Sequence, residues 1–130
     1  MSVLTPPILE QLINLKGDYA EASWQALANG TVLVTVPAVD LPKGWMKERV
    51  TVRFVLPVGY PNARPDCFWT EADLRLIGSR TPKNTGTNQI PGAPPENLLW
   101  FSWHIQSWSP NDHTALTWMR VIKKRFELFE

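Results

Sequence analysis

The stretch Pro57-Val58-Gly59-Tyr60-Pro61-Asn62-Ala63-Arg64-Pro65 divides the chain into two parts with different regular structure. Proline has no backbone N–H to donate, so these three prolines exclude a strand inside a sheet. Upstream, residues 48–56 alternate between apolar and polar side chains, and residues 31–36 have high β propensity. Asn29-Gly30, just before them, is a typical two-residue hairpin signal. We therefore predict antiparallel strands upstream of this stretch, with a loop over residues 37–45 between two of them.

The chain begins with the pattern of a helix. Pro6-Pro7 precede apolar residues between Ile8 and Leu15 whose spacing suits a short amphipathic helix, and Gly17 is expected to end it. Alternation around Trp24 and Ala26 then indicates one further strand before the hairpin turn. The first half is thus predicted to be a helix followed by an antiparallel meander.

Downstream of the proline-rich stretch, residues 66–70 form the last predicted strand. Residues 78–97 hold four prolines and three glycines, which favours a long irregular loop of the kind that is usually functional. Residues 111–114 offer helix N-caps, and apolar residues from Leu116 onward predict a helix to the end of the chain. The prediction is one α+β domain over residues 1–130, with a four-stranded antiparallel meander, a long loop and a helix at each end.

Composition excludes several classes of protein. The formal net charge of +1 is far from the basic balance of nucleic-acid-binding proteins, so no nucleic acid is expected as a partner. The one basic cluster, Lys123-Lys124-Arg125 near Arg120, is expected to be a solvated helix face. No apolar run is long enough to span a membrane, and the N-terminus lacks the pattern of a secretion signal.

A single cysteine cannot form an internal disulfide, and this suits a cytoplasmic protein. With one cysteine and two histidines, we expect no structural zinc site. There is also no glycine-rich phosphate loop, so the prediction includes no cofactor and no metal.

The segment Leu99-Trp-Phe-Ser-Trp-His-Ile-Gln-Ser-Trp-Ser-Pro110 carries the most chemical information in the chain. In an extended segment, side chains two residues apart project from the same face, so Ser102 and His104 would share one surface. Such a pair is either a nucleophile with its base or a packed loop with two polar tips.

The order of these motifs resembles the E2 ubiquitin-conjugating (UBC) superfamily. Tyr60-Pro61 and Pro65 stand where that family has its Tyr-Pro motif before the fourth strand, and Trp108-Ser109-Pro110 matches its Trp-Ser-Pro. Phe68-Trp69-Thr70, together with the Ser-x-His before Trp108, is most similar to the prokaryotic family E branch. The resemblance implies a UBC-like fold, and it implies an E1-like adenylating enzyme, a ubiquitin-like modifier and an acceptor protein as partners. It also implies that the E1-like enzyme docks on the N-terminal helix, around Leu12 and Lys16.

The chain departs from the family in its active-site loop. The segment before Trp108 contains no cysteine, and the residues from Ile90 to Asn97 replace the family's His-Pro-Asn tripeptide. Aligned on Trp108, Ser102 lies within a residue or two of the family's cysteine. The resemblance therefore predicts that Ser102 carries the modifier as an oxyester in place of a thioester.

A serine hydroxyl is a weak nucleophile without a base, and His104 is the predicted base. A third group must orient the imidazole, and Asp112 and Asp66 are the candidates. In the resembling family an asparagine stabilises the oxyanion, which Asn97 or Asn111 would do here.

Cys67 is the alternative nucleophile, although a lone cysteine in a strand is usually a small buried apolar residue. The aromatic and proline residues around the site are expected to be its scaffold, because large rings are more often packed than exposed. These residues are Tyr60, Pro61, Pro65, Trp100, Trp103 and Trp108.

Two further functions stay open at this stage. A non-catalytic E2 variant or RWD-like module would bind the modifier or the E1-like enzyme without Ser102. A hydrolase using Ser102 and His104 would be the third, but the chain has no Gly-x-Ser-x-Gly elbow.

Overall fold

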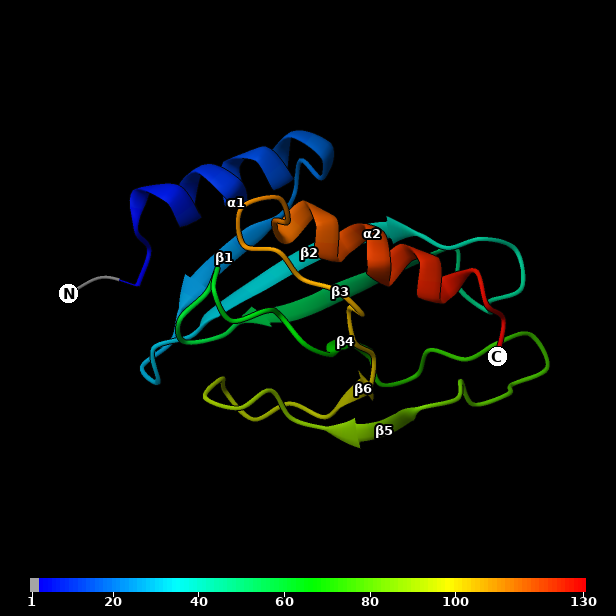
Figure 1. Ribbon diagram of the computed structural model, residues 1–130. Coiled ribbons are helices and arrows are strands. Elements are labelled where there is room, and N and C mark those ends of the chain that lie inside the picture. Colours follow the sequence, from blue (N-terminus) through cyan, green and yellow to red (C-terminus); the bar gives the residue numbers. More distant parts are fainter. Residues whose placement is uncertain (1–2) are drawn as a thin grey trace.

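Two helices cover one face of a six-stranded antiparallel sheet (Figure 1). The computed structural model describes residues 3–130. The sheet order is β1-β2-β3-β4-β6-β5. The elements are α1 (Pro6–Asp18), β1 (Ser23–Ala26), β2 (Val32–Asp40), β3 (Arg49–Leu56), β4 (Phe68–Glu71), β5 (Thr85–Asn88), β6 (Leu98–Phe101) and α2 (Ala115–Phe126).

The predicted α+β class and both terminal helices are confirmed, but the prediction of a four-stranded sheet was wrong. Strands β1 to β4 pair in sequence as a meander, and β6 and β5 then extend the sheet beyond β4. The predicted irregular loop over residues 78–97 contains β5, whose Thr-Gly-Thr-Asn sequence lacks the apolar alternation of an ordinary strand.

Several boundaries also differ from the predictions. Strand β2 continues through the predicted loop as far as Asp40, because a β-bulge between Val36 and Val39 accommodates Pro37, and Ala38 takes a φ of 57° there. Helix α1 ends at Asp18, one residue beyond Gly17, and α2 ends at Phe126, before the end of the chain.

Alternating apolar side chains in β2 and β3 build the main core beneath the helices. Val34 and Val36 of β2, and Val52 and Phe54 of β3, are fully buried. Buried side chains of both helices belong to the same cluster, among them Leu12, Leu15, Trp118, Met119, Ile122 and Phe126.

Four aromatic rings join α2 to the centre of the sheet. Phe68 of β4 and Phe101 of β6 are register partners, and their rings stack with centroids 4.5 Å apart. Phe126 of α2 meets both rings edge-on, at 5.7 Å and 6.0 Å. Trp45 packs edge-on against Phe126, and its Nε1 donates a hydrogen bond to the Phe126 carbonyl oxygen at 2.7 Å. The register of β4 against β6 is therefore fixed by packing as well as by ladder hydrogen bonds.

The opposite face of the sheet carries a smaller apolar cluster. Trp69, Ile90 and Leu98 are buried there, and Trp100 packs against them. Part of the segment between β5 and β6 thus covers the sheet face that the helices leave open.

Trp108 connects the two sequence motifs at the proline-rich turn. Its Nε1 donates to the carbonyl oxygen of Pro61 at 2.7 Å, and its ring lies 6.0 Å from the ring of Tyr60. The Tyr60–Pro61 peptide bond is cis, and Pro65 is buried. The Tyr60 hydroxyl is hydrogen-bonded to Gln11 of α1, and burial raises the pKa of Tyr60.

The basic cluster of α2 is only partly solvated, which corrects the prediction for Arg125. Lys123 and Lys124 are exposed, whereas Arg125 is 1% exposed. Its Nη2 donates to the carbonyl oxygens of Lys83 at 2.9 Å and Glu130 at 2.7 Å. Within residues 3–130, no helix is both long and apolar enough to cross a membrane.

We expect the substitution Phe126→Ala to lower the free energy of unfolding by about 3–5 kcal/mol, because it leaves a cavity among three rings. Ile13→Ala, at a side chain that is 61% exposed in α1, should cost less than about 1 kcal/mol. Urea unfolding of both variants measures the difference. Equal losses would contradict the role assigned to the aromatic cluster.

We expect Trp108→Phe to lower the free energy of unfolding by about 1–2 kcal/mol, because the Pro61 carbonyl loses its donor. The matched control is Trp24→Phe in β1, since the Trp24 Nε1 has no hydrogen-bond partner in the part of the chain that is described. A loss in the control as large as that in Trp108→Phe would assign the effect to ring size.

Candidate functional site

The candidate site lies where β4 begins and β6 ends. Phe68 pairs with Phe101 in an antiparallel register, so the residues before Phe68 run beside the residues after Phe101. The backbone N–H of Cys67 donates to the carbonyl oxygen of Trp103 at 2.9 Å and continues this pairing by one step. Two segments that are far apart in sequence are thereby held side by side.

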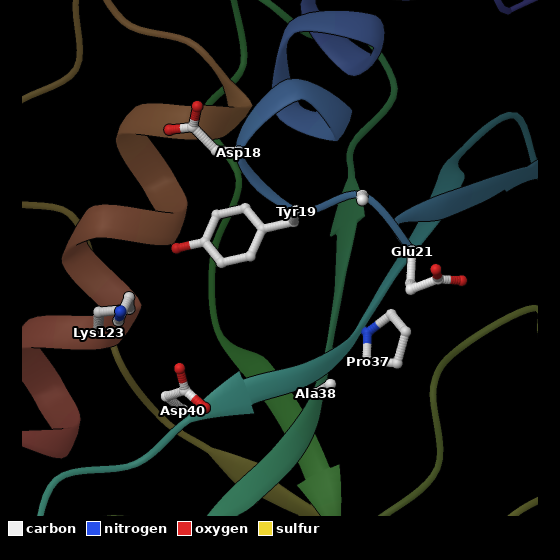
Figure 2. A pocket seen from close by; sticks show the side chains of 8 residues that line it. Asp18, Tyr19, Glu21, Pro37, Ala38, Asp40 and Lys123 are labelled. Atoms are coloured by element: carbon white, nitrogen blue, oxygen red, sulfur yellow. The ribbon is translucent and has the colours of Figure 1, made fainter.

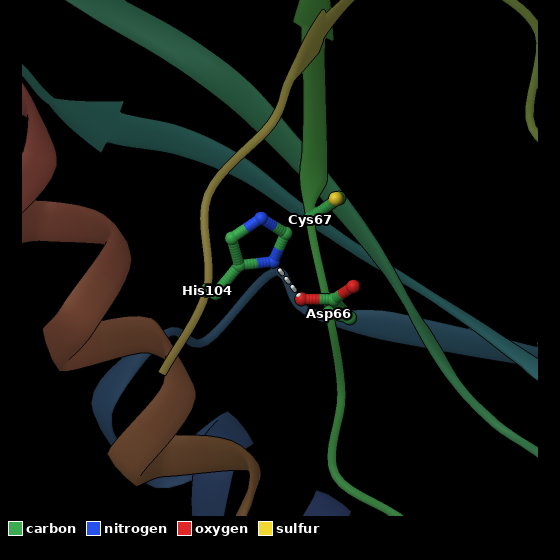
Figure 3. A group of neighbouring side chains, drawn as sticks. All are labelled: Asp66, Cys67 and His104. Carbon is green, nitrogen blue, oxygen red and sulfur yellow. Dashed lines mark hydrogen bonds and ion pairs between the residues drawn. The ribbon is translucent and has the colours of Figure 1, made fainter. Parts of the chain in front are cut away.

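Three side chains with acid-base or ligand chemistry meet at this point (Figure 3). The His104 Nδ1 is hydrogen-bonded to the carboxylate of Asp66. One donor atom from each of Asp66, Cys67 and His104 lies within 4.8 Å of the others. Cys67 has a φ of 62°, which departs from the regular alternation of a strand. With this backbone conformation, the side chains of the neighbouring residues Asp66 and Cys67 both lie close to the His104 imidazole.

The three side chains differ in their access to solvent. The His104 and Asp66 side chains are 52% and 51% exposed, whereas Cys67 is 8% exposed. Burial raises the pKa of the Cys67 thiol, and the negative charge of Asp66 raises it further. The thiol is therefore protonated near neutral pH unless a base removes its proton or a bound metal ion displaces it.

Ser102 lies directly after β6, on a hollow of about 290 Å³. Its backbone N–H donates to the carbonyl oxygen of Asn84 at 2.8 Å. Asn84, Trp103, His104 and Gln106 also line the hollow. Ser102 and His104 thus border one hollow, although β6 itself ends at Phe101. Within residues 3–130, no hydrogen bond joins the Ser102 hydroxyl to His104 or to any other group.

The other predicted polar residues lie elsewhere. Asp112 accepts a hydrogen bond from the Ser109 hydroxyl at 3.2 Å, and Asn111 is exposed in the same turn. Asn97 precedes β6, so it is at the opposite end of that strand from Ser102, about 16 Å away at the usual rise per residue. The structure therefore brings Asp66, and not Asp112, to His104.

The tryptophans around the site take different positions. Trp100 lies within β6 and packs on the sheet face opposite the helices. Trp103 packs against the main core, with the Arg125 guanidinium 5.3 Å from its ring centroid. Trp108 contacts Tyr60 and His113, and His113 Nδ1 accepts a hydrogen bond from the Ser109 backbone N–H at 2.9 Å.

The arrangement at His104 is that of a positioned general base. In the neutral tautomer with its proton on Nδ1, His104 donates that hydrogen bond to Asp66 and keeps a free electron pair on Nε2. An imidazole held in this way can take a proton from a nearby hydroxyl or thiol and return it later. Cys67 has its sulfur within 4.8 Å of a His104 nitrogen, and Ser102 borders the same hollow as His104, so these two residues are the candidate partners.

Asn84 is the residue of this site that the sequence did not reveal. It has a φ of 61°, a conformation that asparagine adopts more readily than most residues, just before β5. Because β5 lacks an apolar alternation, nothing in the sequence indicated that residue 84 would lie beside residue 102.

A larger hollow of about 520 Å³ lies between the end of α1, β2 and α2 (Figure 2). Its charged lining consists of Asp18, Glu21, Asp40 and Lys123, and Tyr19 projects into it. Burial, followed by the nearby charge of Asp18, raises the pKa of Tyr19. This hollow combines no nucleophile with a base, so its chemistry does not compete with that at His104.

Comparison with known proteins identifies the family of the chain. The sequence model described as "Prokaryotic E2 family E" matches residues 14–128, which is nearly the whole chain. No curated protein and no solved structure matches the chain. Since the match includes both sides of the site and every strand of the sheet, the chain belongs to the prokaryotic E2 family E.

Proposed function

We propose that this protein accepts the C-terminal carboxyl of a ubiquitin-like modifier from an E1-like adenylating enzyme and transfers it to an acceptor protein. Membership of the prokaryotic E2 family E supports the general role in conjugation. The observation that supports a chemical step is the Asp66–His104 pair beside Ser102. The product would be an oxyester on Ser102, because the segment before Trp108 holds no cysteine.

The proposed step needs a base at the hydroxyl, which His104 supplies. The Ser102 oxygen attacks the carbonyl carbon of the activated carboxyl, and its proton passes to Nε2 of His104. The bond from that carbon to the E1-like carrier breaks, and His104 gives the proton to the E1 group as it leaves. The Ser102 hydroxyl is not hydrogen-bonded to His104 in the free protein. Such contacts often form only when substrate is bound.

Transfer to the acceptor reverses the proton movement. An acceptor amine or hydroxyl attacks the ester carbonyl and gives its proton to His104, which passes that proton to the Ser102 oxygen as the ester bond breaks. An oxyester is less reactive toward amines than a thioester, so the tetrahedral intermediate needs a donor for its oxyanion. Asn84, which lines the hollow with Ser102, takes the place that Asn97 and Asn111 were predicted to fill.

Cys67 is the alternative carrier. A thiol is intrinsically the stronger nucleophile, and Cys67 lies beside the same base. Its exposure of 8%, however, limits access for the C-terminus of another protein, whereas Ser102 borders an open hollow. Ser102 is therefore the carrier that we propose.

Docking of the E1-like enzyme on α1 requires a correction to the residues involved. Leu12 is 0% exposed and belongs to the core, so it cannot contact a partner directly. Lys16 is exposed, and Ile13 is 61% exposed on the same helix. We propose that Ile13 and Lys16 provide this contact.

The proposal predicts a covalent adduct when the protein is mixed with its E1-like partner, the modifier and ATP. The adduct should resist thiol reductant, be cleaved by hydroxide and be lost in Ser102→Ala. Gel electrophoresis and intact mass measurement detect it. An adduct that persists in Ser102→Ala but disappears in Cys67→Ala would move the carrier to the cysteine. If no adduct forms, and the modifier or E1-like enzyme still binds independently of Ser102, the protein is a non-catalytic binding module.

A second prediction concerns the group that orients His104. Asp66→Asn should slow adduct formation by at least about 100-fold, because the same change in a Ser-His-Asp triad favours the wrong tautomer. Asp73→Asn, which removes a carboxylate paired with Lys47, is the matched control and should stay within about threefold of the unchanged protein. Single-turnover rates give the comparison. A slow Asp112→Asn variant beside a normal Asp66→Asn variant would assign the orienting role to Asp112.

A further inference from the structure

We propose that Asp66, Cys67 and His104 form a binding site for one Zn²⁺ ion, which leaves a fourth coordination position open. Their donor atoms already lie within 4.8 Å of one another at the junction of β4 and β6 (Figure 3). The site shares Asp66 and His104 with the conjugation proposed above, but it requires Cys67 and does not require Ser102, so the two proposals can be tested separately.

The chemistry of the three donors favours zinc over other common divalent ions. They offer a thiolate sulfur, an imidazole nitrogen and a carboxylate oxygen, and Zn²⁺ accepts all three types in one site. Mg²⁺ and Ca²⁺ prefer oxygen ligands alone. Three protein ligands with an open fourth position are typical of accessible zinc sites, whereas closed structural sites use four. The sequence predicted no metal, and its count of one cysteine and two histidines concerned a structural zinc site. An open site with three protein ligands differs from that prediction.

The geometry requires a small rearrangement of exposed side chains. Tetrahedral zinc separates its S, N and O ligands by roughly 3.3–3.6 Å, given the usual bond lengths. His104 Nδ1 is hydrogen-bonded to Asp66, so the ion would take the place of the proton between the two groups. Both side chains are about half exposed and can turn, while Cys67 is fixed by its backbone hydrogen bond to Trp103.

The position of Cys67 is the second observation in favour of a site. Adjacent side chains in a strand point to opposite faces, yet Asp66 and Cys67 both approach His104. Cys67 has a φ of 62°, which interrupts the strand alternation at this point. A non-glycine residue in this conformation lowers the stability of the folded state. A backbone that places a sulfur beside an imidazole–carboxylate pair completes a set of ligands.

Binding of Co²⁺ followed by displacement with Zn²⁺ tests the proposal on the full chain, without any partner protein. We expect one Co²⁺ per chain, with a thiolate-to-cobalt charge-transfer band that Zn²⁺ abolishes. The band should be absent in Cys67→Ala. Affinity should fall by at least about tenfold in His104→Gln and in Asp66→Asn, since even the loss of an outer-shell partner reaches that size. Circular dichroism confirms that each variant is folded.

The matched controls are His113→Gln, at the other histidine, and Ser102→Ala, which should both bind Co²⁺ like the unchanged protein. A missing charge-transfer band in the unchanged protein would overturn the proposal. So would a band of equal affinity in His104→Gln and Asp66→Asn, because the thiol would then bind cobalt alone. If Ser102→Ala abolishes conjugation and leaves cobalt binding intact, metal binding does not depend on the proposed carrier residue. If the unchanged protein binds cobalt but forms no adduct, the conjugation proposal has failed. If it forms the adduct but shows no charge-transfer band, the zinc proposal has failed.

Discussion

The stacked pair of Phe68 and Phe101 is the contact on which the rest of the structure depends. The pair joins β4 to β6, two neighbouring strands that are far apart in sequence. Phe126 of α2 packs edge-on against both rings. Aromatic rings bury large areas and prefer defined mutual angles, so a register slip of one residue would put Phe101 on the wrong face. This packing holds β6, and therefore the segment with Ser102 and His104, beside the start of β4.

The candidate site is a direct consequence of that register. Once Phe68 faces Phe101, Asp66 must run beside the residues that follow β6, and His104 comes within hydrogen-bond distance of it. No loop has to close to form the pair. The base is thus positioned by the sheet, which is more rigid than an irregular loop such as the one predicted over residues 78–97.

Local patterns in the sequence were sufficient for elements that are stabilised locally. The alternation in β2 and β3, the spacing in α1 and α2, and the proline-rich turn each predicted the observed element. Strand β5 was missed because Thr85–Asn88 has no apolar face. Its pairing with β6 stabilises the strand although its own residues have low strand propensity. The Asp66–His104 contact spans 38 positions, so only the tertiary pairing of β4 with β6 could reveal it. Asp66 had been one of two candidates, and the sequence held nothing that distinguished it from Asp112.

Arg125 shows how the walls of the hollow are joined. From α2 it donates to the carbonyl oxygen of Lys83, next to Asn84, and its guanidinium lies over the rings of Phe101 and Trp103. Burial lowers the pKa of Arg125, but arginine keeps its charge because its ordinary pKa is so high. The cation is held by carbonyl oxygens and ring faces, and the negative charge of Glu130 also favours it. An apolar side chain of similar length would fill the space, but it could not donate the hydrogen bond that joins α2 to the segment before β5. Arg125 thus links α2 to two walls of the hollow, the segment at Lys83 and the ring of Trp103, although no residue of α2 lines the hollow among those described.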